Sequence, residues 1–454
     1  MAIINSALQK IKSDVLAPLG GASRVNQVFA DTGHAWRDRV LDPATTTSMF
    51  IQQVLNANTA ISHLQHITGV AVSDSSYCAA RAKLPVEGVA KIVTELCDGY
   101  NQIGQDSGRW RGHRVVIADG TGTIAPDVPA MQAMWPQNEA QKPGCGFPAI
   151  KLLAIMHAHT GMIQHASIMP LRVQEFSQLT AVSGILREGD ILLADRGFCS
   201  YSILADLAKR SVFPVIRMHQ KVRVDFTPGR AHQAVLPKGR RTGKPISRFV
   251  KSLGKDDQIV EWQKPKTRPT WMSQEDFAKQ PLTMLVREMR FKIEEPGMRT
   301  TEITLVTALL DPVRYPKRKI AKLFRKRWEI ELNFRHLKIT LKMDHLKCKT
   351  TDGITKEIMI YILVYNMVRA VMLLAQANQN EDDPNRISFK DAWRWLCAKL
   401  ASRPAEELPR LKVNQIRPGR MYPRQIKKRP KAYDYKNTKP EIMVEAPALQ
   451  AKYA

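Results

Sequence analysis

The chain has 454 residues, of which 44% are hydrophobic, so it is long and apolar enough for two or three domains with a large buried core, and wholesale disorder is excluded. Its 69 Lys and Arg residues outnumber 42 Asp and Glu residues, which gives a net charge of +27. This excess predicts salt-dependent attraction to a polyanion, most simply nucleic acid, although ribosomal and membrane-surface proteins carry similar charge. The charge therefore indicates a class of partner and no reaction.

Cysteine spacing and the start of the chain exclude several further classes. The six cysteines form no CxxC pair and no close Cys/His cluster, which argues against a zinc knuckle and against a disulfide framework. The first residues, MAIINSALQKIKSDV, lack the charged-then-apolar order of a signal peptide. We therefore expect reduced thiols and a cytoplasmic protein.

Residues 1–105 show a helical pattern throughout. Apolar residues recur at helical spacing in MFIQQVLNA, AISHLQHI and VAKIVTELCDGYNQI, and the segments LDPATTT and KLPVEG interrupt them. Eight basic and eight acidic side chains balance one another here. We expect a small, nearly neutral, all-helical N-terminal domain at 1–105.

Residues 106–218 change to an α/β pattern. A short apolar run in GHRVVIADGTGTIAPD ends at Asp119, before a Gly/Thr turn, and AIKLLAIMHAH and GMIQHASIMPL are typical of two strands around a turn. A helix is expected at about 174–186, then a buried strand in GDILLADRGF that ends at Asp195, the helix SYSILADLAKR and the strand FPVIRM. The order β-β-β-α-β-α-β predicts a mixed sheet with short central strands.

Residues 219–310 interrupt that order. Pro, Gly, Lys and Arg are frequent between 228 and 270, and the later segments LTMLVREMRFKI and TTEITLVTALL are typical of strands. We interpret 219–310 as a β-rich insertion, followed at 311–378 by the second part of the α/β core.

The segment LFRKRWEIELNFRHLK, residues 323–338, predicts an amphipathic helix. Arg327, Glu331 and Lys338 fall within an arc of roughly 40° that borders the apolar face, whereas Glu329 points almost opposite Arg327 and is interpreted as a surface residue. A simple explanation of Glu331 is an i,i+4 ion pair with Arg327. The apolar face consists of Ile320, Leu323, Ile330, Phe334, Leu337 and Leu341.

The end of the chain combines an apolar helix with a basic tail. Residues 358–377 have the length of a membrane span, but Asn366 and Arg369 lie inside the stretch, and we interpret it as a buried core helix with no membrane contact. Residues 379–454 are expected to be helical at first and then basic and extended. The segment 410–439 has eleven Lys or Arg residues and a single acid, Asp434.

Three acids are candidates for a joint site. Asp119 and Asp195 each end an apolar strand, where α/β sheets usually present ligand-binding groups, although Asp is also common in ordinary strand-end turns. With Glu331 on a later helix, they predict three carboxylates that meet within a few Å of shared cations. Hard oxygen ligands suit Mg²⁺ or Mn²⁺, and two such ions catalyse phosphodiester chemistry.

The motifs that contain these acids resemble those of a known family. ADGTGT, LADRGF and the spacing Phe324-x2-Arg327-x3-Glu331-x6-Lys338 are similar to the three acidic motifs of DDE transposases of bacterial insertion sequences, in insertion-sequence family four. The resemblance extends to AWRDRVLDPATTTSMFIQQVL and SYCAARAKLP near the N-terminus and to RPGRMYPRQIKKRPKAY in the tail. Each short motif is weakly specific, whereas their order along the chain is strongly specific.

The resemblance implies a fold and roles for individual residues. The fold would be a ribonuclease H-like mixed sheet with a β-rich insertion and an all-helical N-terminal domain. Asp119, Asp195 and Glu331 would be the catalytic and metal-binding triad. The family usually has Tyr where this chain has Phe324, so a phenolic hydrogen bond to DNA is absent. The expected DNA contacts are Arg327, Lys338, Phe324, Lys342 and Arg335, with Trp262 or Trp271 as acceptors of a flipped base, or else surface or minor-core residues.

The activity implied is that of a transposase in the bacterial cytoplasm, associated with the nucleoid. It would bind the inverted-repeat ends of its own element, cut them with Mg²⁺ (or Mn²⁺), two ions per site, and join the 3′-hydroxyls to target DNA. Partners would be double-stranded DNA and further copies of the chain that synapse two ends. The alternatives are a ribonuclease H-like nuclease that cuts without joining and an inactive DNA-binding repressor.

Overall fold

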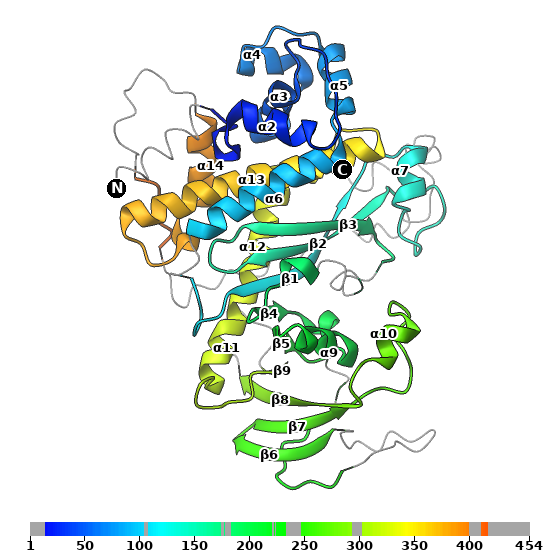
Figure 1. The fold of residues 1–454 in the computed structure, drawn as a ribbon, viewed down its shortest axis with the longest axis vertical. Coiled ribbons are helices and arrows are strands. Elements are labelled where there is room, and N and C mark those ends of the chain that lie inside the picture. The colour runs from blue at the N-terminus through cyan, green and yellow to red at the C-terminus, as the bar shows by residue number, and fades with distance from the viewer. Residues whose placement is uncertain are drawn as a thin grey trace, which may run out of the picture.

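The computed structural model describes residues 14–103, 108–173, 177, 183–219, 222, 224–232, 247–292, 302–398 and 410–415. A layer of helices lies over one end of a long twisted sheet, and the sheet continues away from these helices towards β6 (Figure 1). The basic tail expected beyond residue 415 and most of the helix expected at 174–186 lie outside the described residues. Of that helix, the 3-10 turn η3 (Ser183–Ile185) is described.

The N-terminal segment is helical, as predicted. Helix α3 illustrates the cause, because Asp42 accepts a hydrogen bond from the Thr45 backbone N–H at 2.7 Å and Pro43 occupies the first turn. The apolar side chains Phe50 and Val54 then face the core. The elements are η1 (Ala17–Leu19), α2 (Gly21–Ala30), α3 (Pro43–Leu55), η2 (Ile61–His63), α4 (Leu64–Thr68), α5 (Asp74–Lys83) and α6 (Val86–Ile103).

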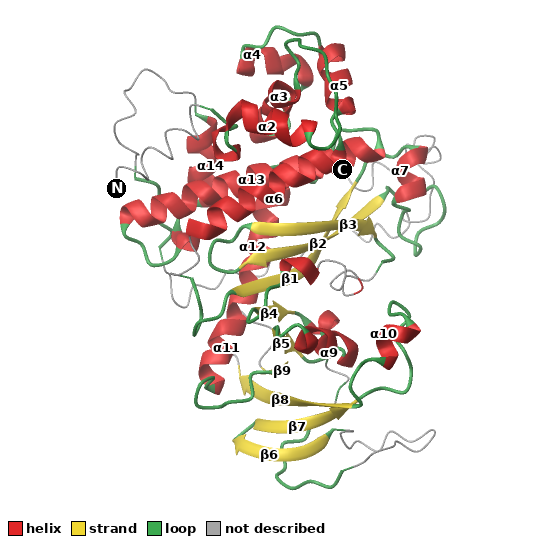
Figure 2. Ribbon diagram, in the orientation of Figure 1, coloured by secondary structure: helices red, strands yellow, loops and turns green. Residues whose placement is uncertain are grey.

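Nine strands form one mixed sheet in the order β3-β2-β1-β4-β5-β9-β8-β7-β6 (Figure 2). Strand β2 runs antiparallel to β1 and β3, while β4 runs parallel to β1 and β5. This order and these directions in the first five strands are those of a ribonuclease H-like sheet. The strands are β1 (Val115–Ile124), β2 (Ala149–His157), β3 (Ile163–Pro170), β4 (Ile191–Ala194) and β5 (Phe213–Arg217).

The strands at 248–307 extend the same sheet, since β9 pairs antiparallel with β5. Both segments expected to be strands, LTMLVREMRFKI and TTEITLVTALL, do form strands. Between β7 and β8, Asp257 and Arg287 form a buried ion pair at 2.6 Å. The elements are β6 (Arg248–Gly254), β7 (Asp257–Gln263), α10 (Gln274–Ala278), β8 (Thr283–Lys292) and β9 (Glu302–Thr307).

The two faces of the sheet bury different sets of residues. In β1, Val115 and Ile117 belong to the large core beneath the helical layer, whereas Val116 and Ala118 belong to the core against helix α9 (Tyr201–Lys209). The alternation follows from the period of two along a strand. Residues at odd positions after Ile117 in β1 therefore face the helical layer.

The longest helix, α13 (Thr351–Gln379), is apolar enough to cross a membrane, yet 94% of its most apolar stretch is buried inside the protein. Its polar residues are satisfied there: Asn366 exchanges two hydrogen bonds of 2.9 Å with the Ile163 backbone, and Arg369 donates to the Thr160 carbonyl at 2.8 Å. The interpretation as a core helix is confirmed. Shorter elements are α7 (Pro129–Met134), η4 (Arg196–Phe198), η7 (Pro384–Arg386) and α14 (Phe389–Cys397).

Two details differ from the sequence predictions. Strand β1 does not end at Asp119 but continues to Ile124, because β2 pairs with it along its whole length. The helix around Glu331 is four successive pieces: α11 (Lys317–Arg325), the 3-10 turn η5 (Lys326–Trp328), α12 (Glu329–Arg335) and the π turn η6 (His336–Thr340). All six residues of the expected apolar face are nevertheless buried.

Candidate active site

Strand register places Asp119 beside Asp195. The parallel pairing of β1 with β4 ends at Ala118 and Ala194, which are register partners, and an aspartate follows each of them. Neighbouring strands are about 4.8 Å apart. Ile117 and Leu193 face the helical layer, so two residues later Asp119 and Asp195 lie on that same side. The loss of the β4 partner, and not the end of β1, therefore exposes Asp119.

Arg327 connects the first aspartate to the glutamate. Its guanidinium donates from Nη1 to Asp119 Oδ2 and from Nη2 to Glu331 Oε1, both at 3.1 Å. The Arg327 side chain is 6% exposed, whereas Glu331 is 58% exposed. Asp119 also accepts from the Gly120 backbone N–H at 2.9 Å. One buried cation thus neutralises two carboxylates that are 212 residues apart in sequence, and the expected i,i+4 pair is one half of this bridge.

Asp195 has a different environment. Its Oδ1 atom is buried without a hydrogen bond in the described part of the chain, and the nearest cation that pairs with it, Arg217 of β5, lies 4.0 Å away. A carboxylate oxygen removed from water without a donor is costly. This oxygen is suited to coordinate a cation, or to accept a hydrogen bond, from a group that is not part of the chain.

A cavity of about 340 Å³ adjoins Asp119 and Glu331. Lys338 and Arg335 line it together with the acids, and Lys338 Nζ lies 3.6 Å from Asp344 Oδ1. Lys342 is exposed in the turn after η6. The cavity is therefore lined by both carboxylates and cations.

The donor set fits a hard divalent cation, since it consists of carboxylates without thiolate or imidazole. However, within the described residues no three His, Cys, Asp or Glu side chains are grouped closely enough to hold a metal ion. In this structure Asp119 and Glu331 are connected through Arg327, and the meeting of all three acids around shared cations stays a prediction. Arg327 lies between Asp119 and Glu331 and occupies the position of the neutralising charge.

Phe324, expected to contact DNA, is instead a core residue. Its side chain is 1% exposed and packs edge-to-face against Trp328, with 6.3 Å between ring centroids. The 3.6-residue period could have predicted this burial, because Phe324 is four residues from Ile320 and next to Leu323, which are both buried.

The two tryptophans proposed for a flipped base lie in the extension of the sheet. Trp262 of β7 is half-buried and donates from Nε1 to Glu288 Oε1 at 2.9 Å. Trp271 is half-buried against the core that includes Leu204 and Val286. These contacts favour the minor-core alternative for both, and a role in base flipping stays a prediction.

Glu329 is not the surface residue expected from its angle on the helix. It is half-buried and accepts a hydrogen bond from Asn385 Nδ2 at 3.0 Å, and desolvation raises its pKa to about 7. The turn η7 covers this side of α12, and no local pattern indicated that contact. Glu329 and Glu331, two residues apart, thus have different surroundings, and Glu331 is the one that faces Asp119.

The sheet order, together with one acid within β1 and another directly after β4, defines a ribonuclease H-like protein with a polar site where the parallel pairing of these two strands ends. Residues 110–367, more than half of the chain, match the family model described as the transposase DDE domain, and the chain belongs to this family.

Two similar proteins can be compared with this chain. The transposase InsG of insertion sequence element IS4 from Escherichia coli (strain K12) is 22% identical over 380 residues, which cover 80% of this chain and 78% of that protein. A looser likeness is to the piggyBac transposase in a cryo-EM synaptic complex with hairpin DNA, with a TM-score of 0.40 and 9% identity over 82% of this chain and 75% of the other. The family assignment depends on the match of residues 110–367.

Proposed function

We propose that this member of the transposase DDE domain family binds the terminal inverted repeats of its own mobile element, cuts the DNA there and transfers the 3′-ends into target DNA. The proposal is supported by two observations that each concern a pair of the acids. Asp119 and Asp195 follow register partners on neighbouring parallel strands, and Arg327 connects Asp119 to Glu331. We further propose a bacterial cytoplasmic location on the nucleoid and self-association of the chain when two ends are synapsed.

The residues present support a Mg²⁺-dependent reaction. Asp119, Asp195 and Glu331 would hold the cations, and Mn²⁺ would substitute as another hard ion. Bound there, two such ions supply activation of a water or a 3′-hydroxyl and neutralisation of the leaving oxygen. Arg327 then has a second task, because a guanidinium released from its carboxylates can donate to phosphate oxygens. Lys338 and Arg335, which line the same cavity, would hold the phosphates on either side.

The charge along the approach to the site also supports binding of DNA. Helix α11 places Lys322 and Arg325 in its last turn, and five more basic residues follow at Lys326, Arg327, Arg335, Lys338 and Lys342. These cations would attract the backbone without reading its sequence. We assign recognition of the ends to the nearly neutral N-terminal helices, where base contacts rather than charge would select the site.

The test is cleavage and strand transfer on DNA that carries the element's ends, with Mg²⁺ or with EDTA. Wild type should cut and join only with the cation. Asp119→Asn, Asp195→Asn and Glu331→Gln should bind the DNA but lose both reactions by at least a hundredfold. Glu329→Gln is the matched control, since it makes the same chemical change two residues away on the same helix and should retain activity.

The other outcomes identify the alternatives. Cutting without joining would favour a ribonuclease H-like nuclease. Binding without cation-dependent cutting would favour a repressor derived from a transposase. Equal activity in Glu331→Gln and wild type would refute the site assignment.

A further inference from the structure

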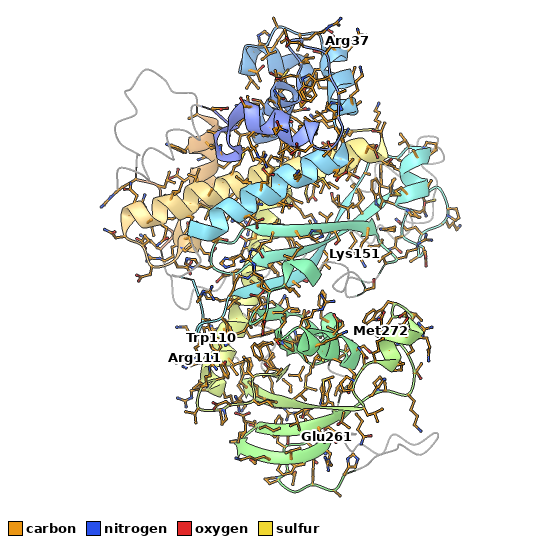
Figure 3. The ribbon with its side chains drawn as sticks, viewed as in Figure 1. Arg37, Trp110, Arg111, Lys151, Glu261 and Met272 are labelled. Carbon is orange, nitrogen blue, oxygen red and sulfur yellow. The ribbon has the colours of Figure 1, made fainter. Side chains whose placement is uncertain are left out.

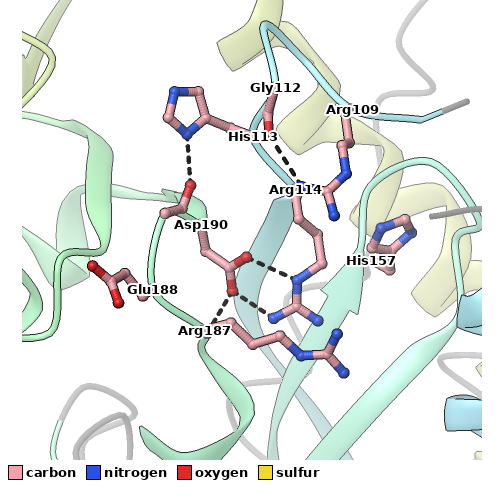
Figure 4. Close-up of a pocket in the computed structure, with 9 residues that line it drawn as sticks. Arg109, Gly112, His113, Arg114, His157, Arg187, Glu188 and Asp190 are labelled. Carbon is pink, nitrogen blue, oxygen red and sulfur yellow. Dashed lines mark hydrogen bonds and ion pairs between the residues drawn. The ribbon is translucent and has the colours of Figure 1, made fainter. Parts of the chain in front are cut away.

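A second polar cavity, of about 250 Å³, lies at the amino-terminal ends of β1 and β4, whereas the aspartates lie where the pairing of these strands ends. It is formed where the chain enters β1 and β4, since Arg114 precedes Val115 and Asp190 precedes Ile191. One water occupies about 30 Å³, so the space accommodates a tetrahedral oxyanion with some solvent. The lining residues are Arg109, Gly112, His113, Arg114, His157, Arg187, Glu188, Gly189 and Asp190 (Figure 4).

The floor of this cavity is a rigid, neutral ion pair. Arg114 donates from Nε to Asp190 Oδ1 at 2.8 Å and from Nη2 to Asp190 Oδ2 at 2.5 Å. The same Nη2 also donates to the Ile185 carbonyl at 2.9 Å. The two-pronged pair fixes both side chains, and its charges cancel. Any net charge in the cavity must therefore come from the other residues.

Two further arginines give the cavity a positive charge. The Arg109 and Arg187 guanidiniums lie on the same side of the Arg114–Asp190 pair as His157, whereas Glu188 lies on the other side (Figure 4). Arg109 donates to the Gly112 carbonyl at 3.1 Å, which holds it at the rim. The backbone N–H of Arg187 donates to Asp190 Oδ2 at 2.8 Å, which holds the Arg187 backbone beside the pair.

His157 adds a neutral donor to this group. Its ring is buried, and burial first, then the charges of Arg114, His159, Arg187 and Arg109, lower its pKa to about 3. The Thr160 backbone N–H donates to His157 Nδ1 at 3.2 Å, so the proton of the neutral ring is on Nε2. Within the described residues, that Nε2–H has no acceptor.

We propose that this cavity is a phosphate-binding site, in which Arg109, Arg187 and the Nε2–H of His157 donate to the oxygens of one phosphate group. Arginine forks match the geometry of phosphate, and a phosphate dianion is attracted by cationic side chains. Arg114 and Asp119 are five positions apart along the extended chain, which corresponds to a rise of about 16 Å. A phosphate bound here is therefore distinct from one held at the acids.

The phosphate can be free or part of a DNA backbone, and in the second case the inference rests on the proposed function. The first arm of the experiment is calorimetric titration of the full-length protein with inorganic phosphate at constant ionic strength. Wild type should bind at one saturable site, and Arg187→Gln and Arg109→Gln should each weaken binding at least tenfold. Arg318→Gln, an exposed charge-matched control on α11, should change the affinity less than twofold.

A spectroscopic readout localises the binding. In NMR spectra of protein labelled with ¹³C at histidine Cε1, the His157 signal is identified as the one that is missing from His157→Gln. Phosphate should shift this signal and raise the pKa of the His157 ring. The signals of distant histidines should not move. The proposal would be overturned if wild type showed no saturable phosphate binding, or if Arg318→Gln lost as much affinity as Arg187→Gln. Neither result requires that His157→Gln be folded.

The second arm identifies the source of the phosphate. If it belongs to DNA, inorganic phosphate should compete with a short duplex, and Arg187→Gln should lower the slope of log affinity against log salt by about 0.9. If duplex binding is unchanged while phosphate binding is lost, the ligand is a free phosphate. Neither arm requires cleavage, so a failure of the catalytic proposal and a failure of this one are distinguishable.

Discussion

Glu329 provides a sharp test of how the site helix is packed. Changing it to Gln keeps an acceptor for Asn385 Nδ2, which is 3.0 Å away, and removes a carboxylate whose pKa desolvation raises from 4.5 to about 7. Lys326 and Arg369 act to lower that pKa and Asp383 acts to raise it, so burial outweighs its cationic neighbours. The folded protein should therefore favour the protonated form near neutral pH.

The magnitude follows from linkage. Between pH 4.5 and 7 the unfolded state binds fewer protons at this position than the folded state, so the free energy of unfolding falls as pH rises. A shift of about 2.5 pKa units corresponds to at most about 3 kcal/mol, less in proportion to residual solvent access. Glu329→Gln should accordingly stabilise the protein by about 2–3 kcal/mol at pH 8 and by less than about 1 kcal/mol at pH 5.

The assay is urea unfolding of wild type and Glu329→Gln at pH 5, 6, 7 and 8. The surface variant Glu139→Gln measures the background effect of replacing a carboxylate with an amide. A difference between wild type and Glu329→Gln that is flat across this pH range, or destabilisation at pH 8, would refute the reasoning from burial.

Three further predictions concern other buried polar groups. Asp195→Asn should leave the free energy of unfolding unchanged or raise it by up to about 1 kcal/mol while abolishing Mg²⁺-dependent cleavage, since Oδ1 is buried without a hydrogen bond; a loss above about 2 kcal/mol in urea would contradict this. Arg287→Met should cost about 3–5 kcal/mol because it leaves Asp257 buried and unpaired, and adding Asp257→Leu should restore most of that in thermal unfolding. Lys356→Met should cost about 2 kcal/mol and speed proteolysis of α5, since the ammonium group donates to three backbone carbonyls of Arg81, Ala82 and Leu84; unchanged cleavage rates would count against it.

The segment that leads into β1 packs against aromatic residues on one side and lines the second cavity on the other (Figures 3 and 4). Arg111 lies 5.6 Å above the Trp110 ring, and Trp110 stacks on Tyr315 at 6.0 Å, so this end of β1 is braced against the segment before α11 (Figure 3). The bracing holds the entry to β1 in place next to the cavity that contains Arg109 (Figure 4). The proposed phosphate site and Asp119 thus lie at two positions along the same strand.

Local patterns in the sequence were sufficient for most elements of the fold. The alternation of two along β1 and β4, the 3.6-residue period of the segment around Ile330 and the apolar length of α13 report burial directly, because each side chain's face depends on its own neighbours in the chain. The candidate acids were predicted for the same reason, since an Asp after an apolar run is visible without any tertiary contact.

Tertiary structure decided what those residues touch. The bridge from Asp119 through Arg327 to Glu331, the burial of Glu329 beneath Asn385 and the position of Phe324 in the core each depend on segments that are distant in sequence. A helical angle states where a side chain points but not what covers it. The sequence by itself therefore determined the class of fold and indicated the candidate acids, whereas packing between distant segments determined the partners and exposure of these acids and the pKa of Glu329.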